Sequence, residues 1–133
     1  MAEILTWPAP ATAVLATLVR ERLPAEFSDV WVGTKIPNPA HSRMVRVSRT
    51  AGGGMATHGQ TDHVYALFEC WADDEDGAEE LANVVRAVLK SSPGHWAHDT
   101  FIRWWKENSG PYSWPDASDQ VRFQFNGEIL LKI

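Results

Sequence analysis

The stretch HVYALFECWADDEDGAEELANVVRAVLK (residues 63–90) decides the fold, because it places an apolar strand directly before an amphipathic helix. Residues 63–71 are β-rich on both faces, which predicts a central strand of a sheet. The residues that follow carry apolar side chains at helical spacing, which predicts a helix with one buried face. That face consists of Ala78, Leu81, Ala82, Val85, Val88 and Leu89.

Four acidic residues, 73–76, precede this helix, and Lys90 lies near its end. Negative charge is favourable beside the free N–H groups of a first helical turn, and positive charge is favourable at the last turn. An EF-hand calcium loop is the alternative, with Gly77 at its sixth position. That register places Ala72 and Asn83 at the first and last ligand positions, where the loop needs carboxylates. Helix capping is therefore the favoured interpretation.

The residues before this stretch predict a second helix and two further strands. Apolar side chains recur at helical spacing over residues 10–23, and a short β-rich run covers residues 29–34. A turn-rich connection with two prolines, residues 36–43, leads into an alternating strand over residues 44–50.

The residues after it predict a terminal antiparallel hairpin. Residues 100–106 are β-prone, an alternating strand begins at Gln120, and turn residues fill positions 108–119. The order of elements predicts one α+β domain over residues 1–133. We expect a mainly antiparallel β-sheet with two principal helices packed on one face.

Composition limits the class of protein. The chain has 133 residues, a formal net charge of -5 and one cysteine, Cys70, which lies in an apolar strand and is expected to be a small buried hydrophobe. The scattered basic residues disfavour nucleic acid as the main partner, and we expect no sequence-specific nucleic-acid binding. No apolar run approaches the ~20 residues that span a bilayer, and the first residues do not resemble a signal peptide. These features favour a soluble protein of a reducing cytoplasm, with no membrane partner.

The stretch SRTAGGGMATHGQTDH (residues 48–63) holds three consecutive glycines between two predicted strands. A phosphate-binding loop is one interpretation, because backbone N–H groups without side chains can wrap an anion. Such loops join a strand to a helix, and the Walker type ends in Gly-Lys-Ser/Thr; this stretch joins two strands and lacks that ending. Its connection of about ten residues is longer than most hairpin loops. We therefore expect a mobile arm that orders against another protein.

Catalytic and metal-binding patterns are weak in this sequence. No Gly-x-Ser-x-Gly nucleophile elbow occurs. His95 and His98 with Asp99, and His58 and His63 near the glycine stretch, leave a metal cluster open, although solvated histidines are the simpler interpretation. We expect no catalytic residues, no metal and no cofactor.

Seven tryptophans are many for a chain of this length. Base stacking, a protein interface and ordinary core packing are all open interpretations of the four that lie close together in the sequence. Adjacent residues of a strand face opposite sides, so one of Trp104 and Trp105 is expected to point away from the core. The four are Trp96, Trp104, Trp105 and Trp114.

Three segments carry a family resemblance: KIPNPAHSRMVRVSRTAGG, TDHVYALFECWADDEDGAEELANVVRAVL and GPYSWPDASDQVRFQFNGEILLK. Their features are a Pro-Asn-Pro turn before an Arg-Val-x-Arg strand, the glycine cluster, an ECWA strand end before an Ala/Leu helix, and the pattern GP…PD…RFQF. Together they resemble the tail terminator, or tail completion, proteins of long-tailed phages that infect actinobacteria.

The resemblance implies a structural virion protein without enzymatic activity. Such subunits form a hexameric ring that ends tail-tube polymerisation and offers a surface to the head–tail connector. The implied partners are further copies of the chain, the tail tube protein and the head–tail connector protein, and the implied location is the virion tail, after assembly in the host cytoplasm. A ring needs head-to-tail contacts between subunits. We expect the subunit interface to include Arg49, Gly52, Gly53, Gly54, Met55, Trp104 and Trp105.

Three alternatives remain open. A related head–tail connector or minor tail protein would share the fold and differ in its partner. A small metal-dependent hydrolase would require the histidines to converge on one ion. A protein that binds single-stranded nucleic acid would lose affinity steeply as salt increases.

Overall fold

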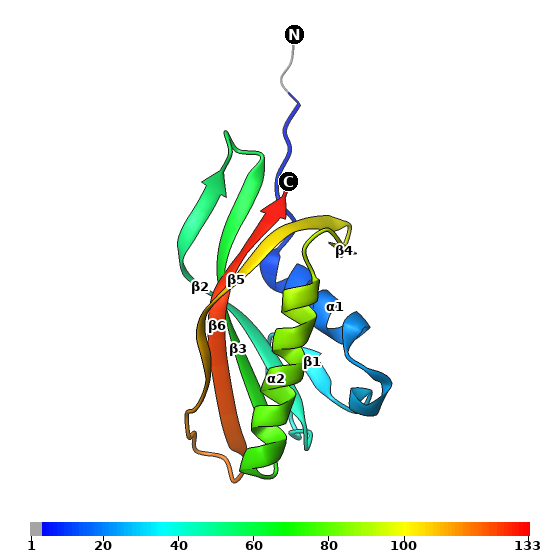
Figure 1. Ribbon diagram of the computed structural model, residues 1–133, viewed down its shortest axis with the longest axis vertical. Helices are drawn as coiled ribbons and strands as arrows, with labels where there is room; N and C mark the ends of the chain where they lie inside the picture. Colours follow the sequence, from blue (N-terminus) through cyan, green and yellow to red (C-terminus); the bar gives the residue numbers. More distant parts are fainter. Residues whose placement is uncertain (1–3) are drawn as a thin grey trace.

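The chain folds in the order helix, three strands, helix, three strands (Figure 1), as seen in a computed structural model that describes residues 4–133. A short 3-10 turn, η1, follows the first helix. The elements are α1 (Ala11–Arg22), η1 (Ala25–Phe27), β1 (Trp31–Gly33), β2 (Met44–Ala56), β3 (Thr61–Ala72), α2 (Glu75–Ser91), β4 (Trp96–Ala97), β5 (Thr100–Ser113) and β6 (Val121–Lys132).

The six strands form one sheet in the order β1-β2-β3-β6-β5-β4. The first pair, β1 and β2, is parallel, and the other neighbours are antiparallel. As predicted, β3 lies inside the sheet, between β2 and β6. Both α-helices pack on one face of the sheet and contact each other (Figure 1). The predicted α+β class, with a mainly antiparallel sheet and two helices on one face, is confirmed.

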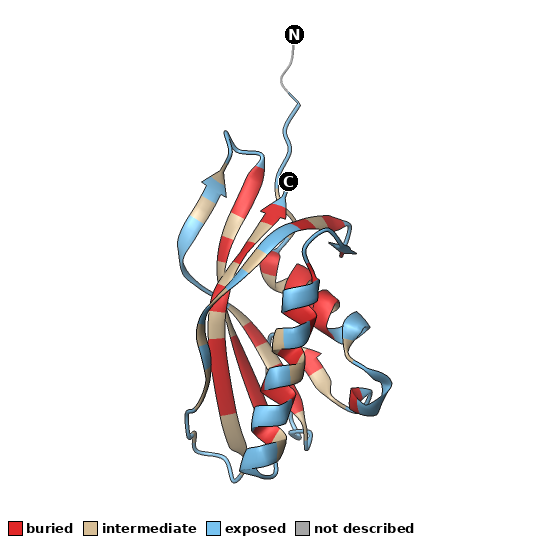
Figure 2. Ribbon diagram, viewed as in Figure 1, coloured by how far each residue is buried: buried red, intermediate tan, exposed pale blue. Residues whose placement is uncertain are grey.

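The hydrophobic core lies between the sheet and the helices, where Figure 2 shows the buried residues of both layers. Alternate residues of β3, including Val64, Phe68 and Cys70, point into it and are fully buried. The Phe68 ring stacks on Phe125 of β6, with ring centroids 5.1 Å apart. The prediction that Cys70 is a buried hydrophobe is confirmed, and burial raises the pKa of its thiol far above the ordinary value.

The sequence pattern of α2 is also confirmed. All six residues of the predicted apolar face are buried. Asp74 is the N-cap, and its side chain accepts a hydrogen bond of 2.7 Å from the Gly77 N–H, so this acidic run supports the helix start. Lys90 lies in the last turn, where positive charge is favourable.

The expectation that about ten residues connect the two strands as a loop is wrong. β2 continues through the glycines to Ala56, β3 begins at Thr61, and residues 57–60 alone form the turn. A shift of register between Thr50 and Gly53, a β-bulge, absorbs the irregular backbone of the glycine run. Glycine has a low strand propensity, which led the sequence to predict a loop, but β3 supplies a template on which the run pairs.

The C-terminal hairpin differs from its prediction in a similar way. β5 extends to Ser113, so the connection to β6 covers residues 114–120 instead of 108–119. β5 is interrupted by three shifts of register, and it tolerates Pro111 because its outer side is not paired there. The two-residue strand β4 was not predicted. Within residues 4–133, no helix combines the length and hydrophobicity needed to cross a membrane.

Candidate functional site

The seven residues predicted for the subunit interface lie on two strands and do not form one patch. Residues directly opposite each other on paired strands share a face of the sheet. Met55 lies opposite Asp62 on β3. Asp62 is two residues from the core residue Val64 and therefore on the same face, so Met55 is on the helix-covered face. Trp104 lies opposite Leu130 of β6, and Leu130 lies opposite His63 of β3. These residues are on the other face of the sheet, which we call the open face. The prediction therefore combined two separate surfaces.

Arg49 forms an ion pair with Asp62 of its own chain. Its guanidinium donates two hydrogen bonds, of 3.0 and 3.2 Å, to the carboxylate of Asp62 on β3. The Asp62 side chain is buried, so this bidentate pair compensates a carboxylate that would otherwise lack a counter-charge. Arg49 thus fixes the outer part of the β2–β3 hairpin.

Two of the three glycines are required by contacts inside the chain. Gly52 and Gly53 have φ angles of 115° and 71°, which side chains disfavour. A Cβ atom on Gly52 would lie 2.2 Å from the Tyr65 ring, and one on Gly53 would lie 2.1 Å from the His63 carbonyl oxygen. Gly54 differs, because the space where its Cβ would be is open. Its φ is also positive, at 130°, and of the three glycines only Gly54 leaves room for a side chain of another molecule.

The outer half of β2 is an open edge of the sheet. β1 pairs only with Met44, Val45 and Arg46, so no strand within residues 4–133 covers the outer side of residues 47–56. We call residues 47–56 the free edge. From Thr50 to Ala56 it carries no charged residue and no proline, and most of it is exposed. An edge without these devices is a template for another strand.

The opposite edge of the sheet is protected. β4 covers only Thr100 and Phe101 of β5. Further along, β5 carries Arg103, Lys106 and Pro111 and is interrupted by bulges. Charges, proline and bulges all hinder the addition of a strand. The two edges of one sheet therefore differ in what they can bind.

Trp104 and Trp105 point to opposite sides, as predicted. Trp105 packs against the core, with its ring edge to face with Phe68 at 5.9 Å. Trp104 is exposed on the open face beside His63, with ring centroids 5.4 Å apart. Trp96 and Trp114 are exposed as well. The exposed rings of these three tryptophans are accessible to a partner, whereas Trp105 packs against the core.

The histidines do not converge. His58, His95 and His98 are exposed, in agreement with the solvated interpretation. His63 departs from it, because its Nε2 atom lies 2.8 Å from Glu128 Oε1 and its side chain is partly buried. This hydrogen bond holds the pKa of Glu128 below its ordinary value. Among the described residues 4–133, no three His, Cys, Asp or Glu side chains are placed to hold one metal ion.

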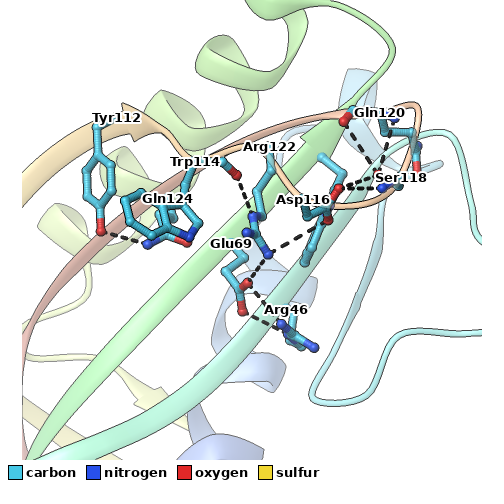
Figure 3. Close-up of polar contacts among 10 residues, drawn as sticks. Arg46, Glu69, Tyr112, Trp114, Asp116, Ser118, Gln120, Arg122 and Gln124 are labelled. Atoms are coloured by element: carbon cyan, nitrogen blue, oxygen red, sulfur yellow. Dashed lines mark hydrogen bonds and ion pairs between the residues drawn. The ribbon is translucent and has the colours of Figure 1, made fainter.

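A polar cluster on the open face was not predicted (Figure 3). Glu69 of β3 accepts two hydrogen bonds from Arg46 of β2, at 2.8 and 2.9 Å, and one from Arg122 of β6, at 2.9 Å. Both guanidinium groups also lie near the Trp71 ring, with Arg46 at 5.5 Å and Arg122 at 5.6 Å from its centroid. Only 5% of the Glu69 side chain is exposed, against 12% for Arg122 and 34% for Arg46. We call these four residues and Asp116 the arginine–glutamate cluster.

The cluster anchors the β5–β6 connection to the sheet. The Asp116 carboxylate accepts hydrogen bonds from the Trp71 indole and the Ser118 hydroxyl, and Arg122 donates to the Trp114 carbonyl oxygen. Burial alone would raise the pKa of Asp116, but these hydrogen bonds and the charge of Arg122 hold it below the ordinary value. Residues 114–120 are thereby fixed across one end of the open face.

A signal for the cluster was present in the sequence. Glu69 is the one acidic residue inside an otherwise apolar run, residues 64–72. A carboxylate in a buried strand requires a cation or several hydrogen-bond donors. The arrangement offers structural support, since both guanidinium groups and the indole N–H are used within the chain.

Comparisons with known proteins add no assignment. No protein-family model matches the chain, and no curated protein sequence matches it.

Proposed function

We propose that this chain is a structural subunit of a phage tail, which assembles with copies of itself into a ring that ends tail-tube polymerisation and presents a surface to the head–tail connector. The proposal takes its biological setting from the three sequence segments that resemble tail terminators. It assigns the protein no enzymatic activity and places it in the virion tail, after assembly in the host cytoplasm.

The observation that carries the proposal is the difference between the two edges of the sheet. A ring is built from head-to-tail contacts, in which two different surfaces of each subunit meet. The free edge of β2 is open and carries no charge from Thr50 to Ala56, whereas the β5 edge carries charges, a proline and three shifts of register. Each subunit therefore has one edge that can accept a strand, and a head-to-tail contact pairs this edge with a different surface of the neighbouring subunit.

Exposed apolar side chains give further support. Met55 lies on the free edge, Trp104 and Trp114 lie on or beside the open face, and Trp96 lies on the opposite edge strand. Large aromatic side chains and methionine are enriched in protein interfaces. Their distribution over several sides of one small domain suits a subunit with more than one partner.

The proposal is tested by the mass of the particle in solution and by its effect on tails. We expect sedimentation to show a closed oligomer, electron microscopy to show rings, and those rings to bind the ends of purified tail tubes. Tails assembled without the protein should be longer and more variable than tails assembled with it. Rings that bind connector particles but not tube ends would favour the related connector function instead. A protein that remains a single chain and leaves tail length unchanged would contradict the proposal.

A further inference from the structure

The segment before α1 is apolar, and its first four described residues are exposed, whereas Ala9 packs against the core. It comprises residues 4–10, called the extended segment below, and it runs away from the body beside the end of β6 (Figure 1). Exposed fractions are 87% for Ile4 and 76% for both Leu5 and Trp7. Within residues 4–133, residues 4–9 make no backbone hydrogen bond. Three large apolar side chains in four positions are costly to leave in water.

We propose that the extended segment of one copy of this chain adds as a strand to the free edge of β2 in a second copy. An extended chain with unpaired N–H and C=O groups satisfies them best on the open edge of a sheet. The free edge has one bulge, between Thr50 and Gly53, and one charged residue, Arg49, which is paired with Asp62. It is the less protected edge of this fold, since the β5 edge carries several charges, a proline and three shifts of register.

The glycines of the free edge fit an aromatic side chain from the added strand. A glycine in an edge strand leaves apolar backbone uncovered, and an aromatic ring on the neighbouring strand can cover it. Inside the chain, the Tyr65 ring already covers Gly52. Nothing covers Gly54, where the space beside the Cα is open. Trp7 is exposed and has the ring that this position lacks.

The occupant is a second copy because, within one chain, the segment lies beside the end of β6 and not along its own free edge (Figure 1). Trp7 and Pro8 lie near Lys132 and Ile133, at the end of β6. β3 and β2 both separate β6 from the free edge, a distance of roughly 10 Å or more at about 4.8 Å per strand. Pro8 and Pro10 restrict the backbone and keep the segment extended. This position of the extended segment beside β6 therefore favours its addition to the free edge of another copy.

The inference deepens the proposed function, and it rests on the self-association in that proposal and not on the role in the tail. Two full-length variants separate the two halves of the contact. Leu5→Ser/Trp7→Ser, called the donor variant, removes apolar side chains of the extended segment. Thr50→Lys/Met55→Lys, called the acceptor variant, places charges on the free edge. Trp96→Ser is the matched control, because Trp96 is 63% exposed, like Met55, but lies on β4 at the opposite edge.

We expect sedimentation to show oligomers for the parent and the Trp96→Ser control, and single chains for the donor and acceptor variants. Self-association of each should weaken roughly 30-fold or more, the effect of losing interface anchor residues. At dilutions where all four proteins are single chains, they should unfold at similar temperatures, because the substituted side chains are exposed. The decisive sample is the mixture of donor and acceptor variants, which retains one intact contact. It should give 1:1 complexes and nothing larger.

A donor variant that assembles like the parent, or a mixture that forms no complex, would overturn the inference. If the parent itself is a single chain, the acetylated peptide ILTWPAP (residues 4–10) is titrated onto the donor variant, whose edge is vacant. Binding that Thr50→Lys/Met55→Lys abolishes would keep the inference while the proposed ring fails, and the absence of binding would reject both. If oligomers form through the extended segment but do not bind tail tubes, the proposed function in the tail is rejected and the inference is kept.

Discussion

At the scale of single residues, the arginine–glutamate cluster shows how a charged group is tolerated inside a sheet. Glu69 has two cations on neighbouring strands, yet they differ in exposure, with 12% of Arg122 and 34% of Arg46 accessible. The penalty for removing one partner of an ion pair grows as the remaining charge is more deeply buried. The three residues are therefore unequal in their effect on stability.

Glu69→Ala should lower the free energy of unfolding by about 3–5 kcal/mol, because it removes the carboxylate that is hydrogen-bonded to the mostly buried Arg122 and leaves Arg122 only the more distant Asp116, at 3.8 Å. Arg46→Ala is the matched comparison, and it should cost about 1 kcal/mol, since that side chain is partly solvated and Arg122 still compensates Glu69. Urea unfolding of the two variants measures both values. Equal losses would show that Arg122 does not depend on Glu69.

Asp116→Asn should change how stability depends on pH. The pKa of Asp116 is lower in the folded chain than in the unfolded chain, so its carboxylate stabilises the fold above the unfolded pKa of about 3.9. That contribution is lost as the pH falls from about 4 through the folded pKa. The melting temperature of the parent should therefore fall more steeply than that of the Asp116→Asn variant below about pH 4. Asp119→Asn removes one charge from the same connection and serves as the control; identical slopes for parent and Asp116→Asn would reject the assignment.

At the scale of elements, the glycine run turns an ordinary hairpin into one with a bulge and an uncovered edge. Gly53 is the position where the backbone allows no substitution, because its Cβ would lie 2.1 Å from a backbone oxygen and its φ is 71°. Gly110 on β5 is a useful contrast, since a Cβ there would meet its nearest neighbour at 3.7 Å, an ordinary contact.

Gly53→Ala should destabilise the outer hairpin by at least about 1 kcal/mol, through the strained backbone and the clash. Gly110→Ala should change stability by less than about 1 kcal/mol. Thermal unfolding compares the two, and amide exchange of residues 50–64 locates the change. Equal effects would mean that the hairpin relaxes around Gly53 at no cost.

The elements that the sequence predicted well are those with a local signature. Both helices and the central strand follow from spacing and caps within the elements themselves, as in Asp74 and the buried face of α2. The outer part of the β2–β3 hairpin could not be predicted from local sequence, because its glycines form a strand only by pairing with β3. The arginine–glutamate cluster could not be predicted locally either. Arg46 and Arg122 are 23 and 53 residues from Glu69, and only the strand order β2-β3-β6 brings them together.

At the scale of the whole molecule, the two faces and two edges of one sheet are specialised. The helices cover one face and build the core, and the open face carries the arginine–glutamate cluster and Trp104. One edge is protected and the other is free. Assembly would therefore change the exposure of the free edge and of the extended segment, while the core stays as it is.

Amide hydrogen exchange should detect this change. In the assembled parent, the amides of residues 47–56 and of the extended segment should exchange more slowly than in the Leu5→Ser/Trp7→Ser variant, because the added strand pairs with them. The amides of β3 should be equally slow in both proteins, since that strand is paired on both sides in the single chain. Equal exchange along the free edge would contradict strand addition.

The burial of Cys70 has a practical consequence. The thiolate is the form that reacts with maleimides and other alkylating reagents, and this thiol is both enclosed by the core and held protonated. The native fold thus behaves toward such reagents as though it contained no cysteine. A cysteine introduced at an exposed position, such as Thr6 or Trp96, would be the single point of attachment for a fluorophore. Dyes placed in this way would allow distances between neighbouring copies to be followed by energy transfer, without first removing the natural residue.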